Sequence, residues 1–599
     1  MGYKSENRIC QNCKGEFTIE PDDFGFYEKI KVPPPTFCWQ CRAMRRMSFR
    51  NFRFLYKRKC DATGKTIFTL IPSEAPMPVY DHEYWISDAW DPTNYGQDYD
   101  FSRPFFEQFK DLFNKVPLTN FLNRNPINSD YGAGLDMRNC YMCFDAGFSE
   151  DSAYGVTLQK SKQCFDTINC KSCELCYYVI NTTNCFKTFF SRNCTQCSDV
   201  WFNQDCVGCL NCFGCSGLRN KSYHIFNEPY TKEEYAKKLK DFNLVSWKKL
   251  QEARSLAESF WLKSPLRFRH GLKDAGCTGD YIYNSSQIRN CFFVNEARNC
   301  AHSQSIIYDP IKDSMDVTSS GIGIELEYEV SGSAGQHNTS FVIDSDYGLN
   351  SNYIINCRNV ADVFGCIALH NKKYCILNKQ YSKEKYDELL PKIKKHMEEM
   401  PYVDARGVVY KYGEFFPIDM SPFGFNESQG YEYFFLSKNE AEKMGYKWCV
   451  REKRNYISNK DPKDLSDSID KVGDDIINDI IQCLHDEKNN HNGSSCNMNC
   501  VGAFNITHQE LQFYRLLNLP LPRLCFNCRH VERVEWRNVP KLFKRRCMCG
   551  DAKVLNYNAQ VTSKHLHGDK KCEVEFETSY ASDRPEIIYC ERCYQQEVY

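Results

Sequence analysis

The chain of 599 residues lacks several features that would place it in a familiar class of protein. It contains no run of about 18 apolar residues and no apolar signal-peptide core near its start, so we expect neither membrane spanning nor secretion, but a cytoplasmic, reducing compartment. Its 76 lysines and arginines balance 77 aspartates and glutamates, which excludes bulk attraction to a polyanion. A nucleophile elbow, Walker A loop, dinucleotide fingerprint, H-E-x-x-H and kinase signature are also missing, so no residue is nominated as catalytic.

Cysteine is what the sequence has in abundance, with 35 residues. A chain of this length can bury a large core without disulfide staples. In a reducing compartment, cysteines are expected as metal ligands or buried thiols. Many of them stand in C-x2-C pairs, the spacing of metal-binding knuckles.

One cysteine-containing segment is written twice. The stretch from Cys13 to Cys60 returns from Cys500 to Cys547 at one constant offset, with matching Phe, Tyr, Pro, Cys and Arg positions. Each copy carries a C-x2-C pair followed by a basic run with interspersed aromatic residues. A spacing kept twice without drift predicts a duplicated metal-binding module.

The first copy predicts a four-thiolate site of spacing C-x2-C-x24-C-x2-C. Zinc takes four soft ligands in a tetrahedron, and four thiolates leave no open position, so this zinc would be structural. Buried free thiols are the alternative. The predicted ligands are Cys10, Cys13, Cys38 and Cys41.

The C-terminal region predicts two more sites, which gives about three zinc ions in all. Near the second site, Cys483 and His485 lie just upstream and could substitute for a ligand or add to the set. Between the cysteines of the third site, His565, His567 and Cys572 lie in a loop that could bind metal but is rather expected to be solvated. The predicted ligands are Cys496, Cys500, Cys525 and Cys528 for the second site, and Cys547, Cys549, Cys590 and Cys593 for the third.

A second repeat fills the middle of the chain. Cys143, Cys164, Cys185 and Cys206 lie 21 residues apart, among short β-prone runs and many asparagines. A period near 20 predicts a β-solenoid in which each repeat is one coil and the cysteines form ladders. The run of Cys206, Cys209, Cys212 and Cys215 also has spacing compatible with an iron–sulfur cluster, but ladder packing already accounts for it.

A third duplication predicts a second solenoid lobe. The segment 206–239 recurs at 357–390, and each copy ends a cysteine- and asparagine-rich stretch and runs into a polar helix. A capping box of Thr231 with Glu234, and Ser382 in the other copy, mark the starts of these helices. We expect each lobe to end in the same exit strand and covering helix.

The basic runs predict contact with nucleic acid, because cations alternate with aromatic residues in both copies. The alternative is that these arginines brace the zinc modules by pairing with acids elsewhere in the fold. The candidate residues are Arg42, Arg45, Arg46, Arg50, Arg53, Lys57, Arg58 and Lys59 in the first run, and Arg529, Arg533, Arg537, Lys544, Arg545 and Arg546 in the second.

Several motifs resemble those of one family. The segments FFEQF, NCYMCF, FGCSGLRNKSYHIFNEPYTKEEY, KYGEFFPIDMSPFGFNE, LPLPRLCFNCRH and SYASDRPEIIYCERCYQQEVY are similar to those of a widespread family of uncharacterised cysteine-rich proteins, known mainly from environmental genomes of very small bacteria. The resemblance spans nearly the whole chain and implies a shared architecture. The metal modules separately resemble zinc ribbons or treble clefs through their knuckles.

The predicted fold is mainly β with helical segments, in which two cysteine-rich β-solenoid lobes are flanked by the duplicated zinc-ribbon or treble-clef-like modules. We divide the chain into an N-terminal zinc-binding module (1–62), an aromatic-rich connector with a helix (63–130), the first β-solenoid lobe (131–230), a helical insert (231–273), the second lobe (274–381), a helical connector (382–480) and a C-terminal zinc-binding module (481–599).

The function expected from these features is that of a non-catalytic, zinc-stabilised solenoid scaffold. Its basic zinc modules would bind nucleic acid or a ribonucleoprotein. The alternatives are a structural or protein-interaction component of a surface or particle, and a metal- or thiol-dependent redox enzyme. No membrane partner and no small-molecule cofactor is indicated.

Overall fold

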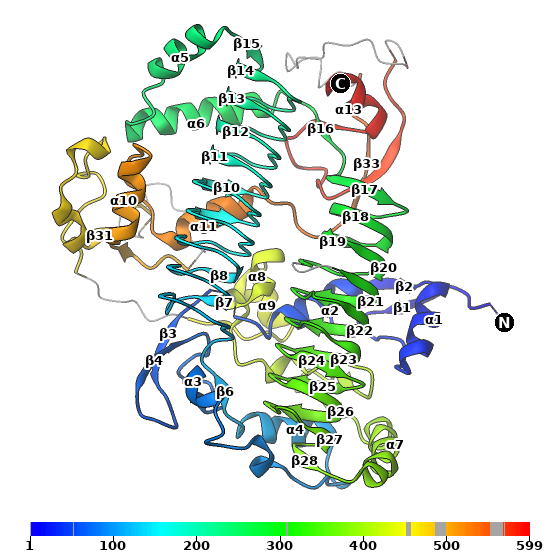
Figure 1. Cartoon of the computed structure of the whole chain (residues 1–599). Coiled ribbons are helices and arrows are strands. Elements are labelled where there is room, and N and C mark those ends of the chain that lie inside the picture. Colours follow the sequence, from blue (N-terminus) through cyan, green and yellow to red (C-terminus); the bar gives the residue numbers. More distant parts are fainter. Residues whose placement is uncertain are drawn as a thin grey trace. The chain divides into compact units, whose positions relative to one another are not determined.

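The computed structural model describes residues 2–51, 53–306, 310–450, 457–485, 499–550, 567 and 570–598. Its regular structure is mainly β-strand with helical segments, which confirms the predicted class (Figure 1). The chain forms two compact units, each assembled from segments far apart in the sequence. Unit 1 is Met1–Leu122, Arg269–Val450 and Val539–Leu542; unit 2 is Asn123–Phe268, Arg451–Asn538 and Phe543–Tyr599. Each unit therefore combines one stack of parallel strands with one copy of the duplicated cysteine module.

The stack of unit 2 consists of short parallel strands, of which β9 to β14 pair in sequence order and β7 pairs with β8 (Figure 1). Phe165 pairs with Tyr177, Tyr177 with Phe189, and Trp201 with Phe213, so each of these residues pairs with the one 12 positions further on. The strands are β7 (Ala133–Leu135), β8 (Phe144–Gly147), β9 (Phe165–Ile168), β10 (Tyr177–Ile180), β11 (Phe186–Phe189), β12 (Ser198–Trp201), β13 (Leu210–Phe213) and β14 (Ser222–Ile225).

A three-residue period underlies this pairing. From Asp136 to Phe226 every third residue has a positive φ, between 46° and 71°. Asparagine, aspartate and glycine tolerate this left-handed conformation best, which explains why asparagine is so frequent here. The 21-residue repeat is therefore wrong as the length of one turn of the stack. It repeats the cysteines only because 21 and 12 are both multiples of three.

From Met137 to Cys215, the residue that follows each left-handed position is buried. All 13 cysteines of this stack occupy such positions, and together with small residues they form one cluster inside it. The Cys143 thiol lies 3.4 Å from the carbonyl oxygen of Ser152, while the Ser152 hydroxyl accepts the backbone N–H of Cys164 at 3.1 Å. Thiol and hydroxyl groups thus form hydrogen bonds with buried backbone groups, which need a partner when they are buried away from water.

The stack of unit 1 follows the same rule with longer strands. Its pairing offset is 12 residues over most of its length, as between Tyr328 and Ser340, and 14 between Ala297 and Ile311. The strands are β17 (Gly271–Ala275), β18 (Gly279–Arg289), β19 (Cys291–Asn295), β20 (Ala297–Ala301), β21 (Ile311–Thr318), β22 (Ile324–Ser331), β23 (His337–Ile343), β24 (Asp346–Leu349), β25 (Asn352–Ile355), β26 (Arg358–Ile367) and β27 (Lys373–Ile376).

Both stacks end in the same way, as the duplicated segment predicts. In unit 2, β14 turns into the antiparallel β15 (Glu228–Pro229) and then into helix α5 (Lys232–Asp241), which opens with the predicted Thr231–Glu234 capping box. In unit 1, β27 turns into β28 (Lys379–Gln380) and then into α7 (Lys383–Glu399), capped by the Ser382 hydroxyl. Each helix places a tyrosine, Tyr235 or Tyr386, in the core.

The two cysteine modules share an element order. Each has a hairpin, two helices and a second hairpin, and the second helix directly follows a cysteine. In unit 1 these are β1 (Glu6–Ile9), β2 (Glu16–Ile19), α1 (Pro21–Ile30), α2 (Trp39–Met47), β3 (Tyr56–Lys59) and β4 (Thr66–Thr69). In unit 2 they are β31 (Ile481–Gln482), β32 (Ala503–Phe504), α10 (His508–Leu516), α11 (Phe526–Glu535), β33 (Phe543–Arg546) and β34 (Glu575–Thr578).

Replacing Asn359 tests the left-handed positions. Its φ is 51°, and its exposed side chain donates to Asn371 Oδ1 at 2.7 Å. Asn359→Val should destabilise the protein by about 1–3 kcal/mol, because a β-branched residue is strained at positive φ. Asn359→Gly should cost less, since glycine adopts this conformation freely. Equal losses of melting temperature in the two variants would argue against a conformational origin.

Candidate metal centres and arginine clusters

The first metal centre unites the four predicted cysteines of unit 1. Cys10 and Cys13 lie between β1 and β2, whereas Cys38 caps α2 and Cys41 lies in its first turn. All four sulfurs lie within 4.8 Å of one another, with Cys13 Sγ 3.8 Å from Cys38 Sγ. A tetrahedron with metal–sulfur bonds of about 2.3 Å has an edge of about 3.8 Å, so the spacing suits a bound metal ion.

The second centre has the same construction in unit 2 but one unexpected ligand. Its sulfurs belong to Cys483, Cys500, Cys525 and Cys528, and Cys525 Sγ lies 3.9 Å from Cys500 Sγ and 3.5 Å from Cys528 Sγ. Cys496, which the sequence predicted here, lies outside the described residues. His485 is exposed and is not a member of this group.

A longer loop explains the change of ligand. Cys483 directly follows β31 as Cys10 follows β1, and β31 pairs with β32 as β1 pairs with β2. Cys10 and Cys13 are 3 positions apart, whereas Cys483 and Cys500 are 17 positions apart. The constant offset of the duplication therefore breaks inside this loop, which is why sequence matching missed Cys483 as the equivalent of Cys10.

The third centre lies at the second hairpin of the unit 2 module. Cys547 follows β33, Cys572 precedes β34, and Cys590 and Cys593 lie at the start of α13 (Glu591–Val598); their four sulfurs lie within 4.8 Å of one another. The predicted Cys549 is not in this group of four and is replaced by Cys572. Cys549 instead joins His567 and Cys593 in an adjoining group, and His565 lies outside the described residues.

The unit 1 module has no such third centre among its described residues. Its Cys60 is buried and its sulfur accepts the backbone N–H of Asp81 at 3.2 Å, just as Cys547 Sγ accepts the N–H of Cys590 at 3.2 Å. Asp81 thus stands where the other module has a cysteine. The unit 2 module differs by a longer segment between β33 and β34, which contains Cys549 and Cys572, and by Cys590 and Cys593 after β34.

Hydrogen bonds to sulfur support metal-bound thiolates in these groups. The backbone N–H of Cys525 donates to Cys483 Sγ at 3.2 Å, and that of Gly502 donates to Cys500 Sγ at 3.4 Å. Donors aimed at sulfur favour the negatively charged thiolate, the form that binds metal. The close grouping of four sulfurs at each centre, together with these donors at the second, fits a bound metal ion.

The arginines of the first basic run are buried in ion pairs. Arg42 Nη2 lies 2.8 Å from Asp316 Oδ2, and Arg46 Nη1 lies 3.0 Å from Asp316 Oδ1. Burial alone would raise the pKa of Asp316, but the guanidinium groups of Arg42 and Arg46 hold that pKa below its usual value. These contacts join α2 to β21 of the parallel stack, so the arginines fix the metal module to the stack of the same unit.

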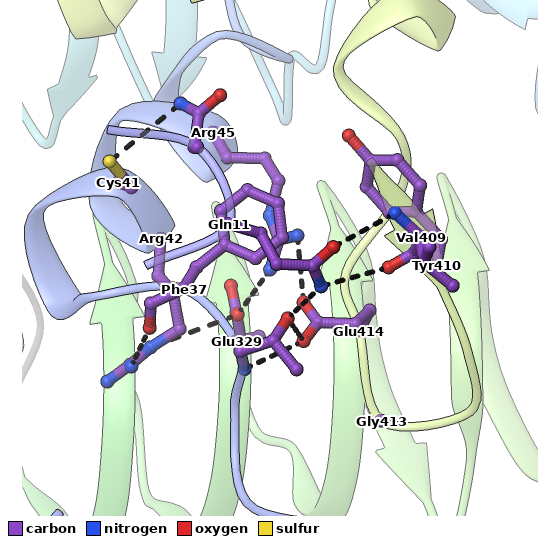
Figure 2. A network of polar contacts seen from close by, with 12 residues as sticks. Gln11, Phe37, Cys41, Arg42, Arg45, Glu329, Val409, Tyr410, Gly413 and Glu414 are labelled. Atoms are coloured by element: carbon purple, nitrogen blue, oxygen red, sulfur yellow. Dashed lines mark hydrogen bonds and ion pairs between the residues drawn. The ribbon is translucent and has the colours of Figure 1, made fainter. Parts of the chain in front are cut away.

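A third arginine extends this cluster (Figure 2). Arg45 lies between Glu329 Oε1, at 2.8 Å, and Glu414 Oε2, at 3.0 Å, and its guanidinium carbon stacks 4.2 Å from the centre of the Phe37 ring. Burial raises the pKa of Glu329, although the arginines beside it oppose this shift. The buried side chains Arg42, Arg45 and Arg46 are therefore paired with three equally buried acidic side chains, those of Asp316, Glu329 and Glu414.

The second basic run repeats the arrangement in unit 2. Arg529 Nε lies 2.8 Å from Asp166 Oδ2, and Arg533 Nη1 lies 3.1 Å from Asp166 Oδ1. Arg529 and Arg533 are the duplicates of Arg42 and Arg46, and the acceptor is again an aspartate at a left-handed position of the stack. We call each set of ion pairs, Arg42 and Arg46 with Asp316 and Arg529 and Arg533 with Asp166, an arginine–aspartate lock. In unit 2, Phe513 of α10 also stacks on Phe165 of β9, with ring centres 3.9 Å apart.

The predicted nucleic-acid contacts need correction at these arginines. A guanidinium buried against a carboxylate cannot also reach a phosphate, and the alternative weighed from the sequence, bracing of the module, describes these residues better. Arg53 is buried against Glu432, Arg50 pairs with Asp344, and Arg537 is 8% exposed. Arg58 and Arg545 are half-buried; the side chains that stay exposed are Lys57, Lys59, Lys544 and Arg546.

The thiols inside the unit 2 stack have a different environment. Cys206, Cys209, Cys212 and Cys215 occupy four successive buried positions of a single 12-residue turn, and they do not form a compact sulfur group among the described residues. Burial raises the pKa of Cys143, Cys164 and Cys206, which keeps them protonated, whereas hydrogen bonds from neighbouring thiols lower the pKa of Cys173. The ladder interpretation of these residues therefore explains more than an iron–sulfur cluster does.

One further sulfur group lies within the stack. Cys164, Cys170 and Cys176 bring their sulfurs within 4.8 Å of one another. The Cys164 thiol also lies 3.3 Å from the Lys162 carbonyl oxygen, and Cys176 lies 3.6 Å from that of Glu174. These contacts suit hydrogen-bonded thiols in a packed interior.

Comparison with known proteins adds no assignment. None of the described helices is long and apolar enough to span a membrane. No protein-family model matches the chain, and no curated protein matches it in sequence. Among solved structures, the chain was matched to a putative acetyltransferase from Desulfovibrio desulfuricans G20, with 9% identity, 45% of this chain and 69% of the other covered, and a TM-score of 0.09.

Proposed function

We propose that the chain is a non-catalytic scaffold in which two β-solenoids are each held by a zinc module. The 12-residue pairing offset and the three-residue period support a solenoid whose turns have four short sides. The paired hairpins and helix-capping cysteines support modules of the zinc-ribbon or treble-clef type. Zinc is proposed for the four-cysteine centres because it favours closed tetrahedral thiolate sites.

The observation that carries this proposal is the duplicated arginine–aspartate lock. Each lock places basic side chains of a metal module against an aspartate of a stack, with distances of 2.8 to 3.1 Å in both units. Arginines of both basic runs thereby form ion pairs in the protein interior. The proposal therefore favours a structural or protein-interaction role over the predicted nucleic-acid role, for which only four of the candidate residues in the two basic runs are exposed.

The chain is further proposed to work in a reducing compartment, the cytoplasm. None of the cysteines within the described residues is in a disulfide bond. Buried thiols that donate hydrogen bonds and thiolates that hold zinc both require reduced sulfur. The family resemblance drawn from the sequence motifs is consistent with such a scaffold and remains a proposal.

Binding of single-stranded RNA tests the choice between these roles. The full chain should bind a labelled oligonucleotide only weakly, because its buried arginines cannot neutralise phosphates. A control variant in which Lys57, Lys59, Lys544 and Arg546 are replaced by glutamine should bind equally weakly and stay folded, since these side chains are exposed. Tight binding that falls steeply with salt and is lost in this variant would restore the nucleic-acid role.

A further inference from the structure

The third metal centre is the only four-cysteine group within the described residues that shares a ligand with another candidate group. Cys593 belongs both to the group of Cys547, Cys572 and Cys590 and to the group of Cys549 and His567. Cys549 Sγ lies 3.3 Å from His567 Nε2, and Cys593 Sγ lies 3.4 Å from the same nitrogen. For metal–sulfur bonds of about 2.3 Å and metal–nitrogen bonds of about 2.1 Å, a tetrahedral edge is about 3.6 Å, close to these distances.

The His567 ring is held in the form that binds metal. Its Nδ1 lies 2.6 Å from the carbonyl oxygen of Lys570. A carbonyl oxygen only accepts, so Nδ1 carries the proton and Nε2 presents its lone pair to the two sulfurs. Histidine ligands of metals commonly donate their second ring nitrogen to a carbonyl in this way, which fixes the tautomer and the ring orientation.

We propose that this end of unit 2 holds a pair of metal ions bridged by the Cys593 thiolate. One ion has the ligands Cys547, Cys572, Cys590 and Cys593, and the second has Cys549, His567 and Cys593. A thiolate sulfur has more than one lone pair and can therefore join two cations. Five thiolates and a neutral imidazole around two divalent ions carry a net charge of −1, less than the −2 of a single ion with four thiolates.

The second ion is expected to exchange more readily than the first. Cys547, Cys572, Cys590 and Cys593 are all buried, whereas His567 is half-buried. Mixed nitrogen and sulfur ligands suit zinc or another borderline-soft divalent ion. The inference goes beyond the proposed scaffold, because a labile ion beside a structural one is a site for taking up and releasing metal.

Zinc counting on the full chain by native mass spectrometry tests the pair. The wild-type chain should carry four zinc ions: three at the four-cysteine centres and one at the shared site. His567→Gln and Cys549→Ser should each lose one ion and keep three. Cys277→Ser, a matched control in the other unit that belongs to none of the sulfur groups, should keep four.

A second measurement separates this inference from the scaffold proposal. A weak chelator should remove the first equivalent of zinc from the wild type rapidly, and this fast phase should be missing in His567→Gln. If the wild type carries three ions, and His567→Gln carries the same number with the same release kinetics, the bridged pair is overturned while the three structural zincs stand. A chain without zinc would overturn both.

Discussion

Replacing Asp316 with alanine is expected to destabilise unit 1 by about 3–5 kcal/mol, because Arg42 and Arg46 would then lack their closest counter-charge. Both guanidinium groups and the carboxylate are almost fully buried. Loss of one partner leaves charges in a medium of low polarity, and the desolvation cost is then no longer offset. Denaturant unfolding monitored by limited proteolysis of unit 1 measures the change, and Asp166→Ala should give a similar loss in unit 2.

An exposed ion pair provides the matched control for the lock. Lys395 and Glu399 pair at 3.3 Å, but their side chains are 76% and 61% exposed. Glu399→Ala should therefore change stability by less than about 1 kcal/mol. If Asp316→Ala were as mild as Glu399→Ala, the locks would not hold the metal modules to the stacks.

Replacing Cys38 with serine should remove one zinc ion and unfold the N-terminal module. Structural zinc contributes about 10–16 kcal/mol of binding free energy in small zinc modules, comparable to the 5–15 kcal/mol that roughly holds a whole native protein. Three thiolates and a hydroxyl bind zinc far less well than four thiolates. Metal analysis, together with protease sensitivity of residues 2–51, measures the outcome.

Cys60 offers the control within the same module. It is buried like Cys38 but lies outside the four-sulfur group, and its sulfur accepts the backbone N–H of Asp81. A serine hydroxyl can accept the same bond, so Cys60→Ser should keep the full zinc content and resist the protease. Retention of zinc and of protease resistance in Cys38→Ser would refute the structural role of the ion.

Local spacing predicted all of the first four-cysteine group and three members of each of the other two. The C-x2-C pairs place two sulfurs on one side of an ion whatever surrounds them, and Cys10, Cys13, Cys38 and Cys41 come together as expected. Cys483 was weighed only as a substitute or additional ligand, and Cys572 only as part of a loop expected to be solvated, because each is separated from a partner cysteine by a long segment of chain. Two copies aligned at one constant offset do not show which cysteine is equivalent once an inserted segment has shifted it along the chain.

Short β-strands in cysteine-rich repeats were predicted, but with the wrong period. The unit that the backbone repeats is three residues, set by the left-handed positions, and four such units bring the chain to the paired position of the next parallel strand. The run Cys206, Cys209, Cys212 and Cys215 displays this phase directly. Gaps elsewhere, where serine, threonine or valine replaces cysteine, made 21 residues look like the repeat.

The role of the arginines could not be read from the sequence. Arg42 and Arg46 lie one helical turn apart, a spacing equally suited to a phosphate or a carboxylate. Their partner Asp316 is far away in the chain and stands at a left-handed position, where aspartate is also expected for conformational reasons. Only the packing of the module on the stack distinguishes these two explanations.

The zinc content of the purified full chain tests the account most directly. The account predicts zinc, without iron, in at least three ions per chain, because three four-cysteine centres are formed by the described residues. Removal of this zinc should unfold both metal modules while the parallel stacks keep their β-structure, as followed by protease mapping and circular dichroism. A folded chain that is free of metal, or one that holds iron, would contradict it.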